Sequence, residues 1–214
     1  VIGVGDNFVR NKIFNQIKKS NINITWETIL SKNALINENV KVGEGTVILS
    51  GSLINSNSKI GSHCIINNSC SINHDNMIND FSSIGPGCIT GGNCTVGKYS
   101  HLGIGSTICT HVRGVDKLFG CRYEENCSAT LGEDSWLMTK ASIGPYKLGS
   151  KSVALMGAVI TKNFGDNKIL GGVPARDLTN KMGLPYIAKT GEEIKNGFER
   201  FIQKYKKNKR INTK

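Results

Sequence analysis

The chain has 214 residues, a formal net charge of +11 at pH 7, and 38% hydrophobic residues. This length supports one domain with a real core, and no apolar run approaches the roughly 20 residues that a membrane-spanning helix needs. Seven basic residues and no acidic ones follow Glu199, so much of the positive charge belongs to a tail, and no base-reading pattern accompanies it to indicate nucleic-acid binding. With no signal peptide in the sequence, the expected location is the cytoplasm.

Residues 1–33 precede a repeat and are predicted to form an N-terminal fragment. Val1–Val4 is predicted as a strand, Phe8–Lys19 as an amphipathic helix and Ile22–Trp26 as a second strand, which together make a βαβ fragment. The glycine pattern of a dinucleotide fingerprint is incomplete in this fragment, so no nucleotide site is predicted from it.

The central part of the chain repeats every six residues. Aliphatic side chains recur at this interval from Ile36 to Ile108, with Thr90 as the only exception. A period of six fits neither an α-helix nor a flat strand, but it is the period of a parallel β-helix, in which each hexapeptide forms one strand and one turn. We therefore predict an all-β solenoid, a parallel β-helix, over residues 34–170.

Two neighbouring positions of the repeat support this prediction. The residue after the aliphatic one is Gly or Asn in all but two repeats, which is expected where a corner requires a positive φ. The residue two places before the aliphatic one is small, except at Val40 and Asn76. Four cysteines occupy this small-residue position and are predicted to be structural thiols: Cys64, Cys70, Cys88 and Cys94.

The repeat is interrupted once. Its phase ends at Ile108 and resumes at Leu131, an offset that is not a multiple of six, so residues 109–130 are predicted to leave the coil as a loop. Three cysteines lie near His111 in this segment, but their spacing matches no common zinc signature, and no metal site is predicted.

Residues 171–214 form the predicted C-terminal segment. Thr190 and Glu193 have the spacing of a capping box, and the apolar residues that follow recur at helical intervals as far as Tyr205. This amphipathic helix, followed by the basic tail, is expected to cover the last coil of the solenoid.

Two histidines are candidates for catalysis. Because three hexapeptides make one triangular coil, His74 and His111 should emerge near the same edge, two coils or roughly 10 Å apart. Asp75 follows His74 directly, and Asn76 breaks the small-residue rule next to it. A carboxylate beside an imidazole orients the ring and stabilises its protonated form, as a general base requires. His63, in a turn, and His101, beside an inward-facing leucine, are predicted to be surface residues.

Several motifs resemble a known family, the hexapeptide-repeat acyltransferases. Three stretches are most similar to its sialic-acid and bacillosamine acetyltransferase group: Ser71–Asp75, Asp80–Ile84 and Gly91–Asn93. Three later stretches resemble the wider O-acetyltransferase branch: Gly132–Trp136, Met156–Lys162 and Gly171–Arg176. The resemblance implies a left-handed β-helix and a homotrimer that binds acetyl-CoA, as co-substrate, between its subunits.

The two branches nominate different bases. In the first group the histidine of the motif is the base and its acidic neighbour assists, which corresponds to His74 and Asp75. In the second branch the catalytic histidine lies just before an excursion loop, a position that His111 fits. A second histidine that contacts acetyl-CoA in some members of the first group falls on Ser83 here.

The resemblance and the chemistry of acyl transfer also nominate residues for binding acetyl-CoA. The candidates are backbone N–H groups at Gly157 and Ala158 for the oxyanion or the pantetheine amides, Ile104 and Trp136 beside the pantetheine, and Lys162 and Arg176 for the phosphates. Ordinary packing of Trp136 and a solvated turn at Lys162 are equally compatible with the sequence.

The predicted function is acetyl-CoA-dependent transfer of an acetyl group to a hydroxyl or amine of a sugar or nucleotide sugar, for surface polysaccharide biosynthesis. One alternative is a non-catalytic β-helix scaffold or binding protein, in which His74 would be replaceable. A γ-type carbonic anhydrase uses the same fold with three zinc-binding histidines, but His74, His101 and His111 have the wrong spacing for that site.

Overall fold

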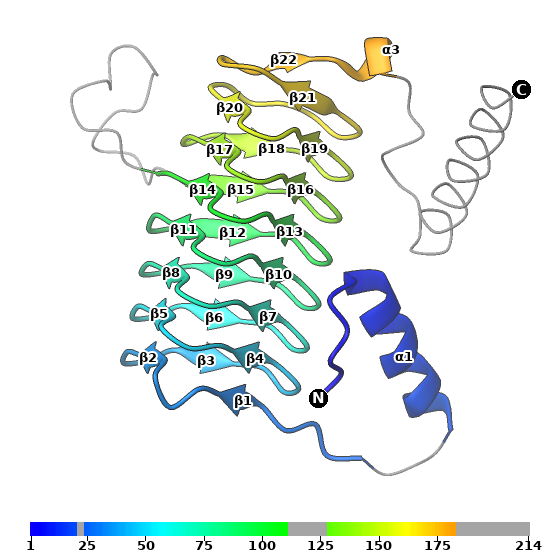
Figure 1. The fold of residues 1–214 in the computed structure, drawn as a ribbon, viewed down its shortest axis with the longest axis vertical. Coiled ribbons are helices and arrows are strands. Elements are labelled where there is room, and N and C mark those ends of the chain that lie inside the picture. Colours follow the sequence, from blue (N-terminus) through cyan, green and yellow to red (C-terminus); the bar gives the residue numbers. More distant parts are fainter. Residues whose placement is uncertain (21–23, 111–127, 183–214) are drawn as a thin grey trace, which may run out of the picture.

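A computed structural model describes residues 1–20, 24–110 and 128–182 of the chain (Figure 1). Strands of two or three residues wind upward in a triangular coil and stack into three sheets. Sheet A contains β1 (Ile29–Leu30), β4 (Val47–Ile48), β7 (Ile65–Ile66), β10 (Ser83–Ile84), β13 (His101–Leu102), β16 (Trp136–Leu137), β19 (Val153–Ala154), β21 (Ile169–Gly171) and β22 (Arg176–Asp177).

Sheet B contains β2 (Leu35–Ile36), β5 (Leu53–Ile54), β8 (Ser71–Ile72), β11 (Ile89–Thr90), β14 (Thr107–Ile108), β17 (Ser142–Ile143) and β20 (Val159–Ile160). Sheet C contains β3 (Lys41–Val42), β6 (Lys59–Ile60), β9 (Met77–Ile78), β12 (Cys94–Val96), β15 (Ala129–Leu131) and β18 (Lys147–Leu148). The turns that join the sheets form three edges, which we call the A–B, B–C and C–A edges.

The strands pair in parallel with the strand one full coil away, except that β22 pairs antiparallel to β21. Ile84, for example, pairs with Ile66 on one side and Leu102 on the other, an interval of eighteen residues in each direction. Three hexapeptides therefore make one coil, and the predicted left-handed parallel β-helix is confirmed.

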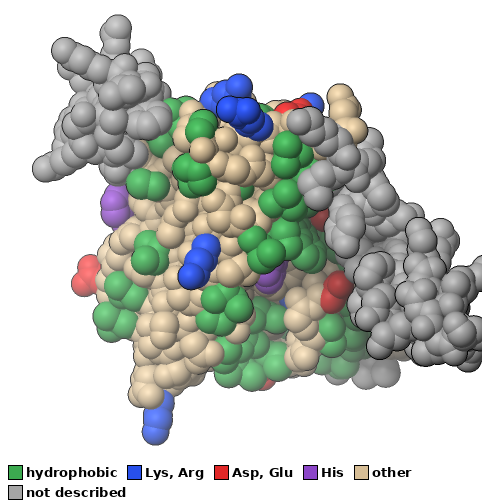
Figure 2. Space-filling model, turned by 45° about the horizontal axis from the view of Figure 1, so that its top comes forward, with side chains coloured by type: hydrophobic (Ala, Val, Ile, Leu, Met, Phe, Trp, Pro, Cys, Tyr) green, Lys and Arg blue, Asp and Glu red, His purple; other side chains and the backbone are tan. Residues whose placement is uncertain are grey.

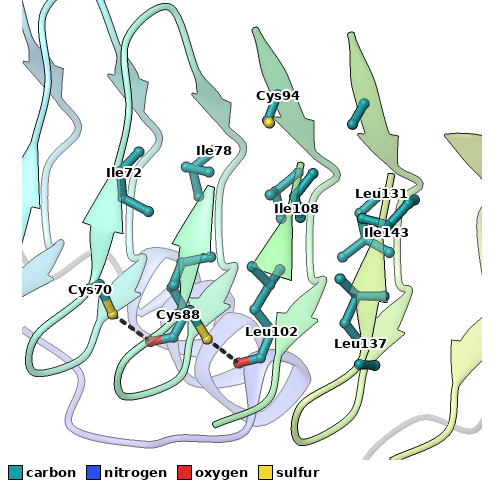
Figure 3. Close-up of a cluster of buried hydrophobic side chains, with 14 of the residues drawn as sticks. Cys70, Ile72, Ile78, Cys88, Cys94, Leu102, Ile108, Leu131, Leu137 and Ile143 are labelled. Carbon is teal, nitrogen blue, oxygen red and sulfur yellow. Dashed lines mark hydrogen bonds between the residues drawn. The ribbon is translucent and has the colours of Figure 1, made fainter. Parts of the chain in front are cut away.

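The aliphatic column of the repeat is the core. From Ile48 to Ile160 its aliphatic members are at most 3% exposed, and Figure 3 shows how they stack from coil to coil. The four cysteines of the small-residue position are also buried, as predicted. Burial raises the pKa of Cys64 and of Cys94 to about 12, so these thiols stay protonated and unreactive at neutral pH.

The positive φ angles are not where the sequence places them. They occur three residues after the aliphatic position, for example at Asn57, Asp75 and Phe81, and not at the Gly or Asn that follows it directly. That earlier position has another requirement, because a Cβ on Gly97 would come within 2.4 Å of the backbone of the next coil. Glycine is therefore needed there for close stacking.

Asparagines at the same position stabilise the stack in a different way. The Asn37 amide donates to Asn55 Oδ1 (2.7 Å), and the Asn55 amide donates to Asn73 Oδ1 (2.9 Å). This ladder of side chains runs along the B–C edge toward the turn that carries His74. Each amide satisfies the next, so the polar groups do not remain unpaired between coils.

The N-terminal fragment differs from the predicted βαβ unit. Helix α1 spans Asn7–Lys19, with Asp6 as its N-cap, but Val1–Val4 and the described part of the second predicted strand (24–26) are not strands. The solenoid itself begins at Ile29–Leu30, before the predicted start at residue 34, because β1 already pairs with β4.

The predicted excursion loop and the predicted C-terminal segment lie only partly within the described residues. The chain leaves sheet B after β14 and re-enters sheet C at Ala129, close to the predicted end of the loop. Most of that loop (111–127) and the predicted helix after Thr190 lie outside the described residues. The described C-terminal part ends in a short helix, α3 (Thr179–Met182). No helix in the described part of the chain is long and apolar enough to span a membrane.

Aromatic residues dock α1 on the C–A edge, and they correct the prediction for His63. His63 is only 1% exposed, because it stacks on Phe81 (5.0 Å between ring centroids) and contacts Phe14 (4.5 Å) and Trp26 (5.0 Å). Burial lowers the pKa of this histidine. The sequence does contain a signal of this burial, because large rings stand at successive corners of one edge and the hexapeptide pattern does not explain them.

Arg10 fastens α1 to the same edge. Its guanidinium is buried and donates to the carbonyl oxygens of Val4 (2.7 Å), His63 (2.8 Å) and Phe81 (2.9 Å). One side chain thus connects the N-terminal fragment with two coils of the solenoid. These carbonyl oxygens stabilise the positive charge of the buried guanidinium in place of water.

Replacing Arg10 by Met should therefore strongly destabilise the protein. Hydrogen bonds to a charged group contribute about 1.5–3 kcal/mol each, and several buried carbonyl oxygens would lose their donor together. We expect the free energy of unfolding in urea to fall by about 3 kcal/mol or more. The matched control is Lys19→Met, which changes an exposed cation on the same helix and should have little effect. Equal stabilities of the two variants would contradict this account.

Candidate active site

His74 lies at an exposed corner of the B–C edge, between β8 and β9. Its Nδ1 is 2.7 Å from Oδ2 of Asp75, and the two side chains are 55% and 46% exposed. A carboxylate oxygen can only accept a hydrogen bond, so this contact places the proton on Nδ1 and leaves Nε2 as the basic nitrogen. A general base requires this geometry, in which a neighbouring carboxylate holds one ring nitrogen and leaves the other basic.

The backbone around the pair is also restrained. Asp75 has a positive φ of 57°, and its N–H donates to Ser56 O (3.1 Å) in the coil below. The carbonyl of His74 accepts from the N–H of Asn93 (3.2 Å) in the coil above. The backbone of the corner is therefore held from both sides, which fixes the point from which the imidazole projects.

Gly92 provides the surface on which the ring rests. A Cβ built on this residue would lie 2.4 Å from Cε1 and 2.7 Å from Nε2 of His74. The imidazole thus lies directly against the backbone of the next coil, and only glycine leaves room for it. Gly92 was not among the predicted site residues, although the consecutive Gly91 and Gly92 were a visible irregularity of the repeat.

His111, the second candidate base, lies outside the described residues, but the start of the same predicted loop is described. Thr110 follows β14 on the B–C edge, two coils above the turn that carries His74. This agrees with the expectation that the two histidines leave the coil at one edge. The position of the His111 side chain stays a prediction.

The remaining predicted residues are distributed over different parts of the solenoid. Lys162 follows β20 on the B–C edge, and its ammonium group lies 5.4 Å from the Phe164 ring centroid. Ile104 (58% exposed) and Gly157 lie instead on the A–B edge, whereas Arg176 is exposed on β22. Within one chain, the predicted catalytic pair and this set of cofactor residues do not form a single site.

Two predicted backbone donors are already engaged. The N–H of Gly157 donates to Thr139 O (3.1 Å), and that of Ala158 donates to Leu155 O (3.0 Å). The structure therefore does not support their use as free donors to an oxyanion or to pantetheine amides. The Cα of Gly157 nevertheless faces open space, since a Cβ added to this residue would meet no atom within 4 Å, so a ligand could approach the backbone there.

Ser83 and Trp136 lie on the outer side of sheet A. Ser83 is 3% exposed, and its hydroxyl donates to Asn7 Oδ1 (2.6 Å) under α1, so this chain covers it. Trp136 packs against His101, with ring centroids 5.3 Å apart. His101 points outward as predicted but is partly buried, and this burial lowers its pKa. His101 is thus the partner that the packing interpretation of Trp136 requires.

On the face viewed in Figure 2, lysine and arginine side chains lie in separate spots and do not form one continuous basic area. Within the described residues, no group of three or more His, Cys, Asp or Glu side chains is arranged to hold a metal ion.

Comparisons with known proteins place this geometry in a wider context. No family model and no curated protein matches the chain. Solved structures do match: WeeI from Acinetobacter baumannii AYE (TM-score 0.58, 24% identity, covering 83% of this chain and 69% of that chain) and the acetyltransferase domain of PglB from Neisseria gonorrhoeae FA1090 in complex with acetyl coenzyme A (0.55, 20%, 83% and 69%).

A third match is PerB from Caulobacter crescentus in complex with CoA and GDP-perosamine (TM-score 0.56, 22% identity, covering 81% of this chain and 67% of that chain). The chain thus spans about two thirds of the length of these structures. At this identity the likeness concerns the fold. By that fold, the chain is a hexapeptide-repeat β-helix of the kind found in these acetyltransferase structures.

Proposed function

We propose that the protein is an acetyl-CoA-dependent acetyltransferase with His74 as its general base. The observation that carries the proposal is the 2.7 Å contact between His74 Nδ1 and Asp75 on an exposed corner of the fold. A solvated surface histidine needs neither an adjacent carboxylate nor a glycine under its ring. Both features are present here, and the carboxylate contact leaves Nε2 as the reacting nitrogen.

The proposed reaction begins with a neutral amine or a hydroxyl on the acceptor. As its nitrogen or oxygen attacks the thioester carbon, Nε2 of His74 takes up the acceptor's proton, and Asp75 stabilises the imidazolium that forms. Collapse of the tetrahedral intermediate breaks the C–S bond. The CoA thiolate leaves and receives the proton from His74, so the products are the acetylated acceptor and free CoA.

We further propose a sugar or nucleotide sugar as acceptor, in surface polysaccharide biosynthesis in the cytoplasm. PerB is described with GDP-perosamine, an amino sugar nucleotide, and with CoA, which supports an amine on a nucleotide sugar as the first acceptor to test. The surplus of basic over acidic residues that remains outside the tail would attract both of these phosphate-containing substrates.

The proposed site also needs a homotrimer, because Ile104 and Gly157 lie on a different edge from His74. Exposed apolar side chains support contact between copies along sheet B and the A–B edge: Leu35, Ile89, Ile104, Met156 and Val173. The outer positions of sheet C instead carry mainly polar residues, as expected for a solvent-facing side, with Met77 as the one apolar exception: Lys41, Lys59, Met77, Thr95, Thr130 and Lys147. In a trimer, the A–B edge of one copy would complete the site at the B–C edge of another.

The test is release of CoA thiol from acetyl-CoA, measured with amino sugars, neutral sugars and their nucleotide derivatives as acceptors. We expect turnover that depends on the acceptor, and a sedimentation coefficient that corresponds to a trimer. Absence of both turnover and acetyl-CoA binding would favour the second candidate, a β-helix scaffold.

A further inference from the structure

Two residues depart from the repeat in the interior beneath His74. Between residues 34 and 106, Asn76 occupies a position where the corner otherwise takes Ser, Thr, Cys or Ala, apart from Val40, and Thr90 interrupts the aliphatic column. They are 2% and 0% exposed, respectively. Asn76 Nδ2 donates to Thr90 Oγ1 at 2.9 Å, so the two exceptions are partners of each other.

Asn76 first does what a serine does at this position. Ser58 shows the usual pattern, in which its hydroxyl accepts from the N–H of the residue eighteen later (3.1 Å) and donates to the carbonyl fifteen later (2.8 Å). Asn76 makes the two equivalent hydrogen bonds: its Oδ1 accepts from Cys94 N–H (2.7 Å), and its Nδ2 donates to Gly91 O (2.9 Å). The two protons of Nδ2 are shared among Gly91 O, Thr90 Oγ1 and Asn73 O. Serine would therefore satisfy the coil at this corner.

Two extra hydrogen bonds of the pair converge on Asn73, the residue before His74. In the first, Asn76 Nδ2 donates to Asn73 O (2.6 Å). The contact of Asn73 Nδ2 with Thr90 O (2.6 Å) belongs to the regular repeat, because Asn67 and Asn79 make the equivalent contact. The Asn73 N–H donates to Thr90 Oγ1 (3.3 Å), whereas the equivalent N–H of Asn55 donates to a carbonyl of the next coil. The Asn76–Thr90 pair thus adds a second donor to the Asn73 carbonyl, beside Ser58 Oγ, and gives the Asn73 N–H a hydroxyl acceptor in place of a backbone carbonyl.

This arrangement has no advantage for the core itself. A buried hydroxyl and amide in an aliphatic column must be paired to avoid an energetic penalty, whereas the usual Ile and Ser would fit the repeat without this requirement. The irregularity occurs at the corner that carries the catalytic candidates. One of the two exceptions, Thr90, also directly precedes the Gly91–Gly92 turn, which supports the imidazole.

We propose that Asn76 and Thr90 are positioning residues that hold the Asn73–Asp75 turn so that His74 keeps its contact with Asp75 and its place against Gly92. This positioning role rests on the proposed function, since the orientation of Nε2 affects activity only if His74 acts as a base. Neither residue touches the substrate in this role.

The test is the double variant Asn76→Ser, Thr90→Val, which restores the regular repeat. It should fold with an unchanged or higher Tm, because serine keeps both usual hydrogen bonds and valine restores the column. We expect kcat to fall at least tenfold with the KM for acetyl-CoA unchanged. The ¹⁵N resonances of neutral His74 should change from one tautomer, with the proton on Nδ1, to a mixture of both.

The control is Ser52→Ala, which removes a buried corner hydroxyl on the A–B edge, away from His74. It should lower the Tm and leave both the His74 spectrum and kcat as in the wild type. An unchanged single-tautomer spectrum in the double variant would overturn the inference, whatever the turnover. If the spectrum changes but the wild-type protein transfers no acetyl group to any acceptor, the positioning role stands and the proposed function fails.

Discussion

Replacing His74 by Ala should reduce kcat for acetyl transfer by about 100- to 10,000-fold, the usual contribution of a general base. The acceptor would have to lose its proton to water, although acetyl-CoA would still bind. We therefore expect a KM for acetyl-CoA close to that of the wild type. The side chain is 55% exposed, so the variant should retain its fold and its Tm.

Two further variants decide how the base works. Asp75→Asn keeps the shape, and asparagine tolerates the positive φ of this position, but the carboxylate that orients the ring is lost. A charge-assisted hydrogen bond of about 1.5–3 kcal/mol corresponds to a decrease of roughly 10- to 100-fold in kcat. His111→Ala is the competing case: full loss of turnover in this variant, with His74→Ala fully active, would assign the base to His111.

Gly92→Ala should have a large effect on activity with little effect on stability. The added Cβ would occupy the place of the imidazole, 2.4 Å from Cε1, and the ring is free to swing outward. Gly92 does not have a positive φ, so alanine strains no backbone there. Because a misplacement of about 1 Å can cost 100-fold in rate, we expect kcat to fall by about this factor.

The matched control is Gly165→Ala, where a Cβ would meet nothing within 4 Å and φ is not positive. Both variants should have a free energy of unfolding within about 1 kcal/mol of the wild type, since a tolerated alanine mainly restricts the unfolded chain. If Gly92→Ala were as active as Gly165→Ala, the imidazole would not need its place against the next coil during catalysis.

The hexapeptide period alone determined the solenoid, its core and its stacking interval. In a coil of three hexapeptides, residues eighteen apart become neighbours, so a local pattern also specifies the long-range contacts. For the same reason, the exceptions at Asn76 and Thr90 and the pair His74–Asp75 are visible in the sequence itself. A repeat makes each irregular residue conspicuous, and here those residues surround one corner.

Only the tertiary structure decided what depends on contacts outside the repeat. The burial of His63 and Ser83 results from the docking of α1 on the coil, and Arg10 forms its bonds with carbonyl oxygens, which leave no trace in side-chain periodicity. The location of the positive φ angles likewise required the backbone. The role of Gly92 became visible only when the next coil brought its Cα against His74, because the absence of a Cβ matters only once a neighbour fills the space.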